Sequence, residues 1–67
     1  MGYEIKNTYG IAVGQVRKWK ITRWGTEPFT VVEHIQFPTG QQAWAIRAKG
    51  RLITVDQGDL ASESELV

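Results

Sequence analysis

Residues 29–37 constrain the fold of this chain most strongly. They are rich in β-branched and aromatic residues, and their alternation places four apolar side chains on one face of an extended strand: Phe29, Val31, Ile35 and Phe37. Glu33 interrupts that face, which predicts a strand that bends or leaves the core near its middle. No segment has the apolar spacing of a long helix, so the sequence predicts an all-β fold.

Two further segments repeat the same period of two. Residues 43–48 direct Trp44 and Ile46 to one side, which we assign to the core, and residues 51–56 align Ile53 with Val55. Lys49 and Gly50 between them predict a two-residue hairpin turn. Residues 38–41 predict the preceding turn, with Gly40 free to take a positive φ.

The stretch before residue 29 predicts shorter elements. Residues 13–20 alternate as a strand in which Gly14 marks a bulge or a close backbone approach, and residues 22–28 form a loop around Gly25 and Pro28. Residues 3–6 predict a short first strand with Tyr3 and Ile5 on one face, followed by a turn at residues 7–10.

The chain as a whole predicts one domain over residues 1–60 and a separate tail over residues 61–67. Residues 57–60 predict a short 3₁₀ turn that packs Leu60 against the sheet, and the small, acidic residues after it predict a frayed end. With no cysteine among 67 residues, disulfides and thiolate zinc sites are excluded, so the core depends on apolar packing.

The order of these segments resembles the small SH3-like barrels of the Tudor and KOW type. The resemblance covers residues 11–60 and is carried by Val13-Gly14-Gln15-Val16, Phe29-Thr30-Val31-Val32-Glu33, Trp44-Ala45-Ile46-Arg47, Gly50-Arg51-Leu52-Ile53-Thr54-Val55 and Asp59-Leu60. It implies a small SH3-like antiparallel barrel of about five short strands with a terminal 3₁₀ turn.

Charge is distributed unevenly along the chain. Residues 1–51 hold all eight Lys and Arg against three Glu, a net charge of +5, whereas residues 52–67 hold four acidic residues and no basic one, a net charge of −4. A basic body with an acidic tail is typical of chains that bind polyanions, and it is equally compatible with two charge sets that neutralise each other.

The residue inventory argues against an enzyme, a cofactor and a metal site. The serines, Ser62 and Ser64, lie in the predicted tail, and no cysteine can act as a nucleophile. His34 is the sole histidine, and we expect it at the surface or half-buried. Asp56 and Asp59 predict a solvated turn. No apolar run has the length of a signal peptide or a membrane span, which predicts a cytoplasmic protein without a membrane partner.

Residues 16–24 hold the strongest candidate binding surface, with four of the eight basic residues and two of the three tryptophans. Basic side chains contact phosphates, and an exposed indole stacks on bases. We expect Trp24 to be exposed, whereas Trp19 fits either core or surface. The candidate residues for binding nucleic acid or another partner are Arg17, Lys18, Lys20, Arg23, Trp24, Arg47, Lys49 and Arg51. A solvated outer face is the alternative interpretation of these charges.

These residues predict a non-catalytic binding module whose first candidate ligand is nucleic acid. The alternative is a protein-interaction module, such as a small adaptor or a phage-type inhibitor of a host protein complex, with Trp24 as the anchor. The Tudor resemblance implies a third class, a methyl-lysine reader, which would require Tyr9, Trp19 and Trp24 to converge. Pairing through exposed sheet edges would give a homodimer or a larger ring.

Overall fold

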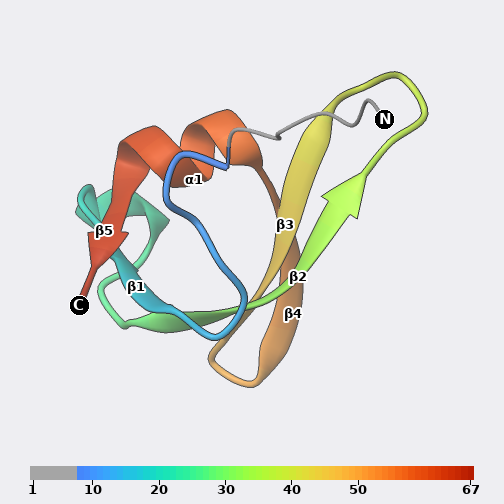
Figure 1. The fold of residues 1–67 in the computed structure, drawn as a ribbon. Helices are drawn as coiled ribbons and strands as arrows, with labels where there is room; N and C mark the ends of the chain where they lie inside the picture. The colour runs from blue at the N-terminus through green and yellow to red at the C-terminus, as the bar shows by residue number, and fades with distance from the viewer. Residues whose placement is uncertain (1–7) are drawn as a thin grey trace.

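The computed structural model describes residues 8–67, which form one antiparallel sheet with a short helix against it (Figure 1). Five strands in this part of the chain take the order β4-β3-β2-β1-β5. The elements are β1 (Val16–Trp19), the 3₁₀ helix η1 (Thr22–Trp24), β2 (Phe29–Gln36), β3 (Gln42–Ala48), β4 (Arg51–Asp56), α1 (Gln57–Glu63) and β5 (Ser64–Leu66). The predicted all-β class with five short strands is confirmed. The sheet is compatible with a small barrel-like fold but is not closed, because β4 and β5 are its two ends.

The β2–β3–β4 meander follows the alternation of the sequence except in the second half of β2, where His34 lies on the face of Val31 and Ile35 on the opposite face, which corrects the prediction that Phe29, Val31, Ile35 and Phe37 share one face. The pairing of β2 with β3 shifts between Val31 and Glu33, so Val32 is an extra residue and the strand bends where Glu33 predicted a break. Lys49 and Gly50 both have positive φ, 54° and 76°, as a type I′ hairpin turn requires. The predicted hairpin between β3 and β4 is therefore confirmed.

Strand β1 is shorter than the predicted strand over residues 13–20. The Gly14 N–H donates to the Val31 carbonyl at 2.8 Å, and the Val31 N–H donates to the Gln15 carbonyl at 2.9 Å. Gly14 and Gln15 therefore both face Val31 of β2, which is the pattern of a bulge. Gly14 has a φ of +95°, a backbone conformation that favours glycine. Beyond β1, the predicted loop over residues 22–28 contains η1.

The C-terminal residues correct two predictions. In place of a 3₁₀ turn, residues 57–63 form α1, whose first turn is capped by Asp56, since its Oδ2 accepts a hydrogen bond of 2.9 Å from the Gly58 N–H. In place of a frayed tail, Ser64 to Leu66 pair with β1 as β5, and Ser64 is 2% exposed. The tail is ordered because its small buried serine bonds to β1 and to the helix before it.

The core lies between the sheet and α1. It contains Ile11, Phe29, Val31, Trp44, Ile46, Val55 and Leu60. The predicted core position of Trp44 and the packing of Leu60 against the sheet are confirmed, and the Trp44 Nε1–H donates to the buried Gln57 Oε1 at 2.7 Å. His34 is half-buried, as predicted, and stacks on Trp44 with ring centroids 4.2 Å apart.

The start of the described chain is a turn. The Ile11 N–H donates to the Thr8 carbonyl at 2.9 Å, and Tyr9 and Gly10 between them have positive φ. The strand predicted at residues 3–6 lies outside the described residues. Within residues 8–67, no helix has the length and apolar character needed to cross a membrane.

Candidate binding groove

Arg17, the first of the candidate binding residues, is buried and cannot contact a phosphate. Its side chain is 6% exposed, and its Nε–H donates to Ser64 Oγ at 2.9 Å, with further bonds to the Ser64 carbonyl at 3.3 Å and to Gln15 Oε1 at 3.1 Å. Burial lowers the pKa of Arg17, because desolvation disfavours its charged form. Arg17 therefore joins β1 to β5, which corrects its assignment to the surface.

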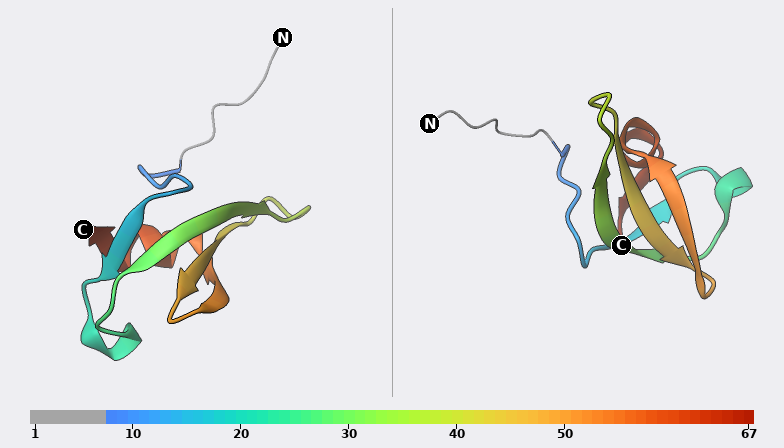
Figure 2. Two further views of the ribbon diagram at one scale, coloured as in Figure 1. Left: turned by 90° about the horizontal axis from the view of Figure 1, so that it is seen from below. Right: turned by 90° about the vertical axis from the view of Figure 1, so that its right-hand side faces the viewer.

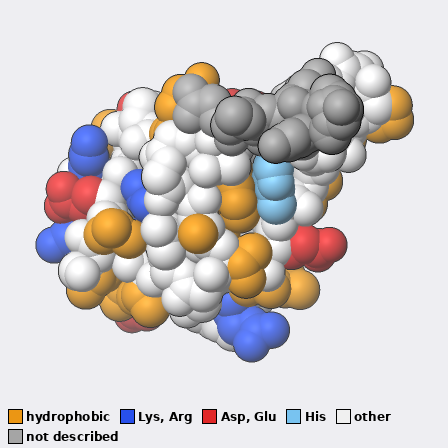
Figure 3. All heavy atoms as spheres, in the orientation of Figure 1, with side chains coloured by type: hydrophobic (Ala, Val, Ile, Leu, Met, Phe, Trp, Pro, Cys, Tyr) orange, Lys and Arg blue, Asp and Glu red, His pale blue; other side chains and the backbone are white. Residues whose placement is uncertain are grey.

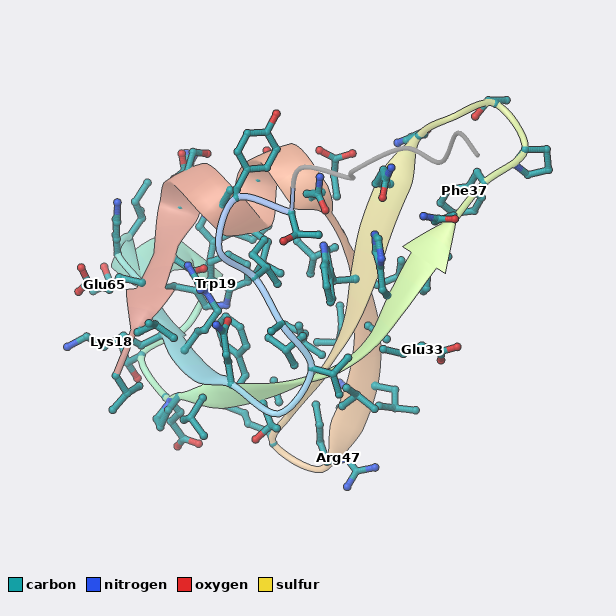
Figure 4. All side chains as sticks on the ribbon, viewed as in Figure 1. Lys18, Trp19, Glu33, Phe37, Arg47 and Glu65 are labelled. Carbon is teal, nitrogen blue, oxygen red and sulfur yellow. The ribbon has the colours of Figure 1, made fainter. Side chains whose placement is uncertain are left out.

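The other basic residues among the candidates do not gather on one face of the protein. Lys18 Nζ lies 3.9 Å from Glu65 Oε2 on the neighbouring strand, and Lys20 is exposed just beyond it. Arg47 pairs with Thr30 and lies on the outer face of the sheet, far from Lys18 in the view of Figure 4. In the same view, Figure 3 shows basic side chains at the left edge beside acidic ones and others at the lower edge.

Trp24 returns to β1 and stacks on Trp19. The turn of η1 reverses the chain after Ile21, with the Trp24 N–H donating to the Ile21 carbonyl at 3.2 Å. The two indole rings lie 5.3 Å apart at an angle of 30°, and Trp19 in turn contacts the buried Phe29 with centroids 4.8 Å apart. Trp24 is 45% exposed, as expected, whereas Trp19 is half-buried. An anchored indole thus supports an exposed one.

Two adjoining pockets open beside this stack, with volumes of about 220 and 150 Å³. Both are lined by Trp19, Trp24, Ala48 and Ile53, and we call the combined surface the tryptophan groove. Ile53 on β4 is 45% exposed and lines both pockets together with the two indoles. The groove therefore lies between the loop that carries η1 and the β3–β4 hairpin.

The two ends of the tryptophan groove carry opposite charges. The larger pocket includes Asp56 and Asp59, and the smaller one includes Lys49 and Arg51 together with Glu27. Asp56 is already engaged, because it caps α1 and its Oδ1 accepts from Gln41 Nε2 at 3.2 Å. Asp59, by contrast, is exposed on the first turn of α1.

The groove is suited to holding a side chain. Its larger pocket of about 220 Å³ is smaller than the roughly 300–1,000 Å³ typical of small-molecule sites. Within residues 8–67 there is no group of three or more His, Asp or Glu side chains able to hold a metal ion. The shared walls are apolar, so binding there would depend on burial of an apolar or aromatic group.

Three of the predicted binding residues meet at the groove: Trp24, Lys49 and Arg51. Lys18, Lys20, Arg23 and Arg47 lie outside it at the surface. Ile53 and Asp59 were not identified from the sequence as residues of the binding site. Alternation places Ile53 on the same face of the strand as the candidate Arg51, which was a signal for Ile53.

Comparison with protein-family models, with curated proteins and with solved structures gave no significant match for this chain.

Proposed function

We propose that the protein is a non-catalytic binding module that holds a short segment of a partner protein in the tryptophan groove. The observation that carries this proposal is the exposed Trp24, stacked on Trp19 and lining a pocket together with the exposed Ile53. Exposed apolar side chains around a pocket are typical of interaction sites. A small adaptor, or a phage-type inhibitor of a host protein complex in the cytoplasm, would use a surface of this kind.

The anchoring of Trp19 supports the proposal energetically. Trp19 contacts Phe29 of β2 and packs against the core, so Trp24 stacks on an anchored side chain and should lose little additional freedom when a ligand covers it. Preorganised aromatic side chains in the centre of an interface are the usual binding hot spots.

Nucleic acid is the second candidate, because Lys49 and Arg51 line the same pocket as Trp24. A phosphate at those two residues would place a base near the exposed indole. Three observations weaken this candidate: Arg17 is buried, Lys18 pairs with Glu65, and the carboxylates at the other end of the groove repel phosphates.

The methyl-lysine reader implied by the Tudor resemblance has less support. The rings of Trp19 and Trp24 stack on each other, so a cation could not enter between them without separating them. Tyr9 is not among the residues that line either pocket. The five-stranded antiparallel sheet is compatible with a small barrel-like fold, and the Tudor resemblance itself rests on the sequence pattern.

Selection from a displayed library of random peptides on the immobilised chain tests the proposed function. The affinity of the best peptide is then measured by titration calorimetry for the parent and for Trp24→Ala. We expect Trp24→Ala to weaken binding by about 30-fold, which corresponds to roughly 2 kcal/mol at a hot spot.

Phe37→Ala is the matched control, since Phe37 is also aromatic and exposed (42%) but follows β2 and lines neither pocket. It should leave the affinity within about twofold. Peptides that bind Trp24→Ala as well as the parent would refute the proposal. Salt-sensitive binding of single-stranded oligonucleotides, with no selected peptide, would favour the nucleic-acid candidate instead.

A further inference from the structure

The tryptophan groove lies along an edge of the sheet that has no neighbouring strand among residues 8–67. β4 is the last strand in the order β4-β3-β2-β1-β5, and Figure 2 (right) shows it between β3 and the loop that carries η1. Ala48 and Arg51 flank the two-residue turn and therefore exchange backbone hydrogen bonds. Because the pattern alternates, the backbone N–H and C=O groups of Leu52 and Thr54 point away from β3.

β4 lacks two features that often protect an edge strand, a proline and a bulge. Its six residues contain no proline, its pairing with β3 runs from Ala48↔Arg51 to Ala43↔Asp56 without a register shift, and Leu52 and Ile53 are exposed. An edge of this kind can accept an added strand, in which the backbone supplies affinity and alternate side chains enter pockets. On β4, the side chains on the face of Ile53 are the ones beside the groove.

The opposite charges at the two ends of the groove favour one order of charged residues along an added strand. Arg51 and Lys49 lie where β4 begins, and Asp59 lies beyond its end. Four residues of extended chain span about 13 Å, so residues four apart in a ligand would reach both ends from the same face. The residue midway between them would lie between Trp24 and Ile53.

We propose, building on the proposed function, that the ligand is an extended segment of a partner protein that adds to β4 as an antiparallel strand. The ligand has a basic residue that contacts Asp59. Two positions later an apolar residue enters the pocket, and two positions after that an acidic residue contacts Arg51 and Lys49. Antiparallel pairing is chosen because it is slightly more stable per residue than parallel pairing.

The chain itself does not supply this pattern. No Lys or Arg among its 67 residues is followed by an apolar side chain two positions later and by Asp or Glu four positions later. Arg17 and Arg51 meet the first condition, but Ile21 and Val55 stand where the acidic residue is required. A second copy of these 67 residues therefore does not fit the groove in this arrangement, which favours a partner protein as the source of the ligand.

The test uses the peptides selected on the full chain. We expect the base-x-apolar-x-acid order to be enriched among them and the reversed order to be absent. The double variant Arg51→Glu, Asp59→Lys keeps the net charge, and it should weaken the base-first peptide by at least about tenfold and favour the acid-first peptide of the same composition. N-methylation of the backbone N–H groups that face β4 should abolish binding to the parent chain, whereas N-methylation at the alternate positions should preserve it.

The outcomes separate this inference from the proposed function. Peptides that require Trp24 but show no charge order and tolerate every N-methyl group would overturn strand addition and leave the proposed function standing. Peptides that bind without Trp24 would overturn both. A dimer of the free chain in sedimentation equilibrium that selected peptides dissociate would assign the edge of β4 to a second copy and would also overturn the inference.

Discussion

The contact between Arg17 and Ser64 makes the stability of the protein depend on a residue near its C-terminus. Ser64 Oγ accepts from the Arg17 Nε–H at 2.9 Å and donates to the Leu60 carbonyl, and both side chains are buried. The variant Ser64→Ala removes one oxygen and leaves these two buried groups without that partner. A hydrogen bond to a charged group contributes about 1.5–3 kcal/mol, so we expect the free energy of unfolding to fall by about 2 kcal/mol.

That loss is large for a chain of this size. Stabilities of about 0.05–0.15 kcal/mol per residue give roughly 3–10 kcal/mol for 67 residues. Urea unfolding followed by tryptophan fluorescence measures the change. With a slope of about 1 kcal/mol per molar urea, the midpoint should fall by about 2 M.

Ser62→Ala is the matched control for this experiment. Ser62 is also a serine near the C-terminal end of α1, and its Oγ donates to the Gly58 carbonyl at 2.9 Å, but it is exposed. Its replacement should change the free energy of unfolding by less than about 0.5 kcal/mol. The explanation is refuted if the two variants unfold at the same urea concentration, because Ser64 would then contribute no more than an exposed serine.

Three further substitutions test other parts of the fold, each by urea unfolding. Asp56→Ala removes the cap of α1 and should lower the free energy of unfolding by about 1 kcal/mol; an unchanged midpoint would show that the cap contributes nothing. Gln57→Leu removes the acceptor of the buried Trp44 Nε1–H and should lower it by about 1–3 kcal/mol, whereas a neutral effect would contradict the importance of that bond. Lys49→Asn places Asn-Gly at a turn with two positive φ angles and should raise it by about 0.5 kcal/mol; a loss would contradict the assignment of a type I′ turn.

The strands that could be predicted are those whose signals are local. Alternation in residues 29–37, 43–48 and 51–56, together with the turn at Lys49 and Gly50, predicted the β2–β3–β4 meander and the core position of Trp44. The bend in β2 also followed from a single residue, Glu33, in an otherwise apolar face. These features depend on neighbours in the sequence, so the sequence alone contains them.

The burial of Arg17 and the strand formed by the C-terminal residues depend on contacts between distant parts of the chain. Nothing in the small, acidic segment after Leu60 indicates a strand, because β5 is ordered by pairing with β1 and by the bond between Ser64 and Arg17, 47 residues apart. Arg17 and Trp19 are two residues apart on β1, so their side chains lie on the same face of the strand. Because that face points inward, the burial of Arg17 follows once a polar partner is available beside it.

The tryptophan groove could be predicted only in part. The exposure of Trp24 followed from its place in a loop, but the turn of η1 that stacks it on Trp19 has no clear sequence signal. The meeting of Trp24 with Ile53 and Asp59 joins three elements that are separated in the sequence. Only the tertiary structure shows that the basic residues are dispersed and that an apolar surface lies between charges of opposite sign.

A nitrogen–hydrogen correlation NMR titration of the full chain with the best selected peptide tests the groove most directly. We expect the indole N–H signals of Trp19 and Trp24 to shift together with the backbone amides of β4, while the amides of Lys18 and Lys20 stay in place. Shifts confined to Lys18, Lys20 and their neighbours, with both indole signals unchanged, would contradict the assignment of the tryptophan groove as the binding site.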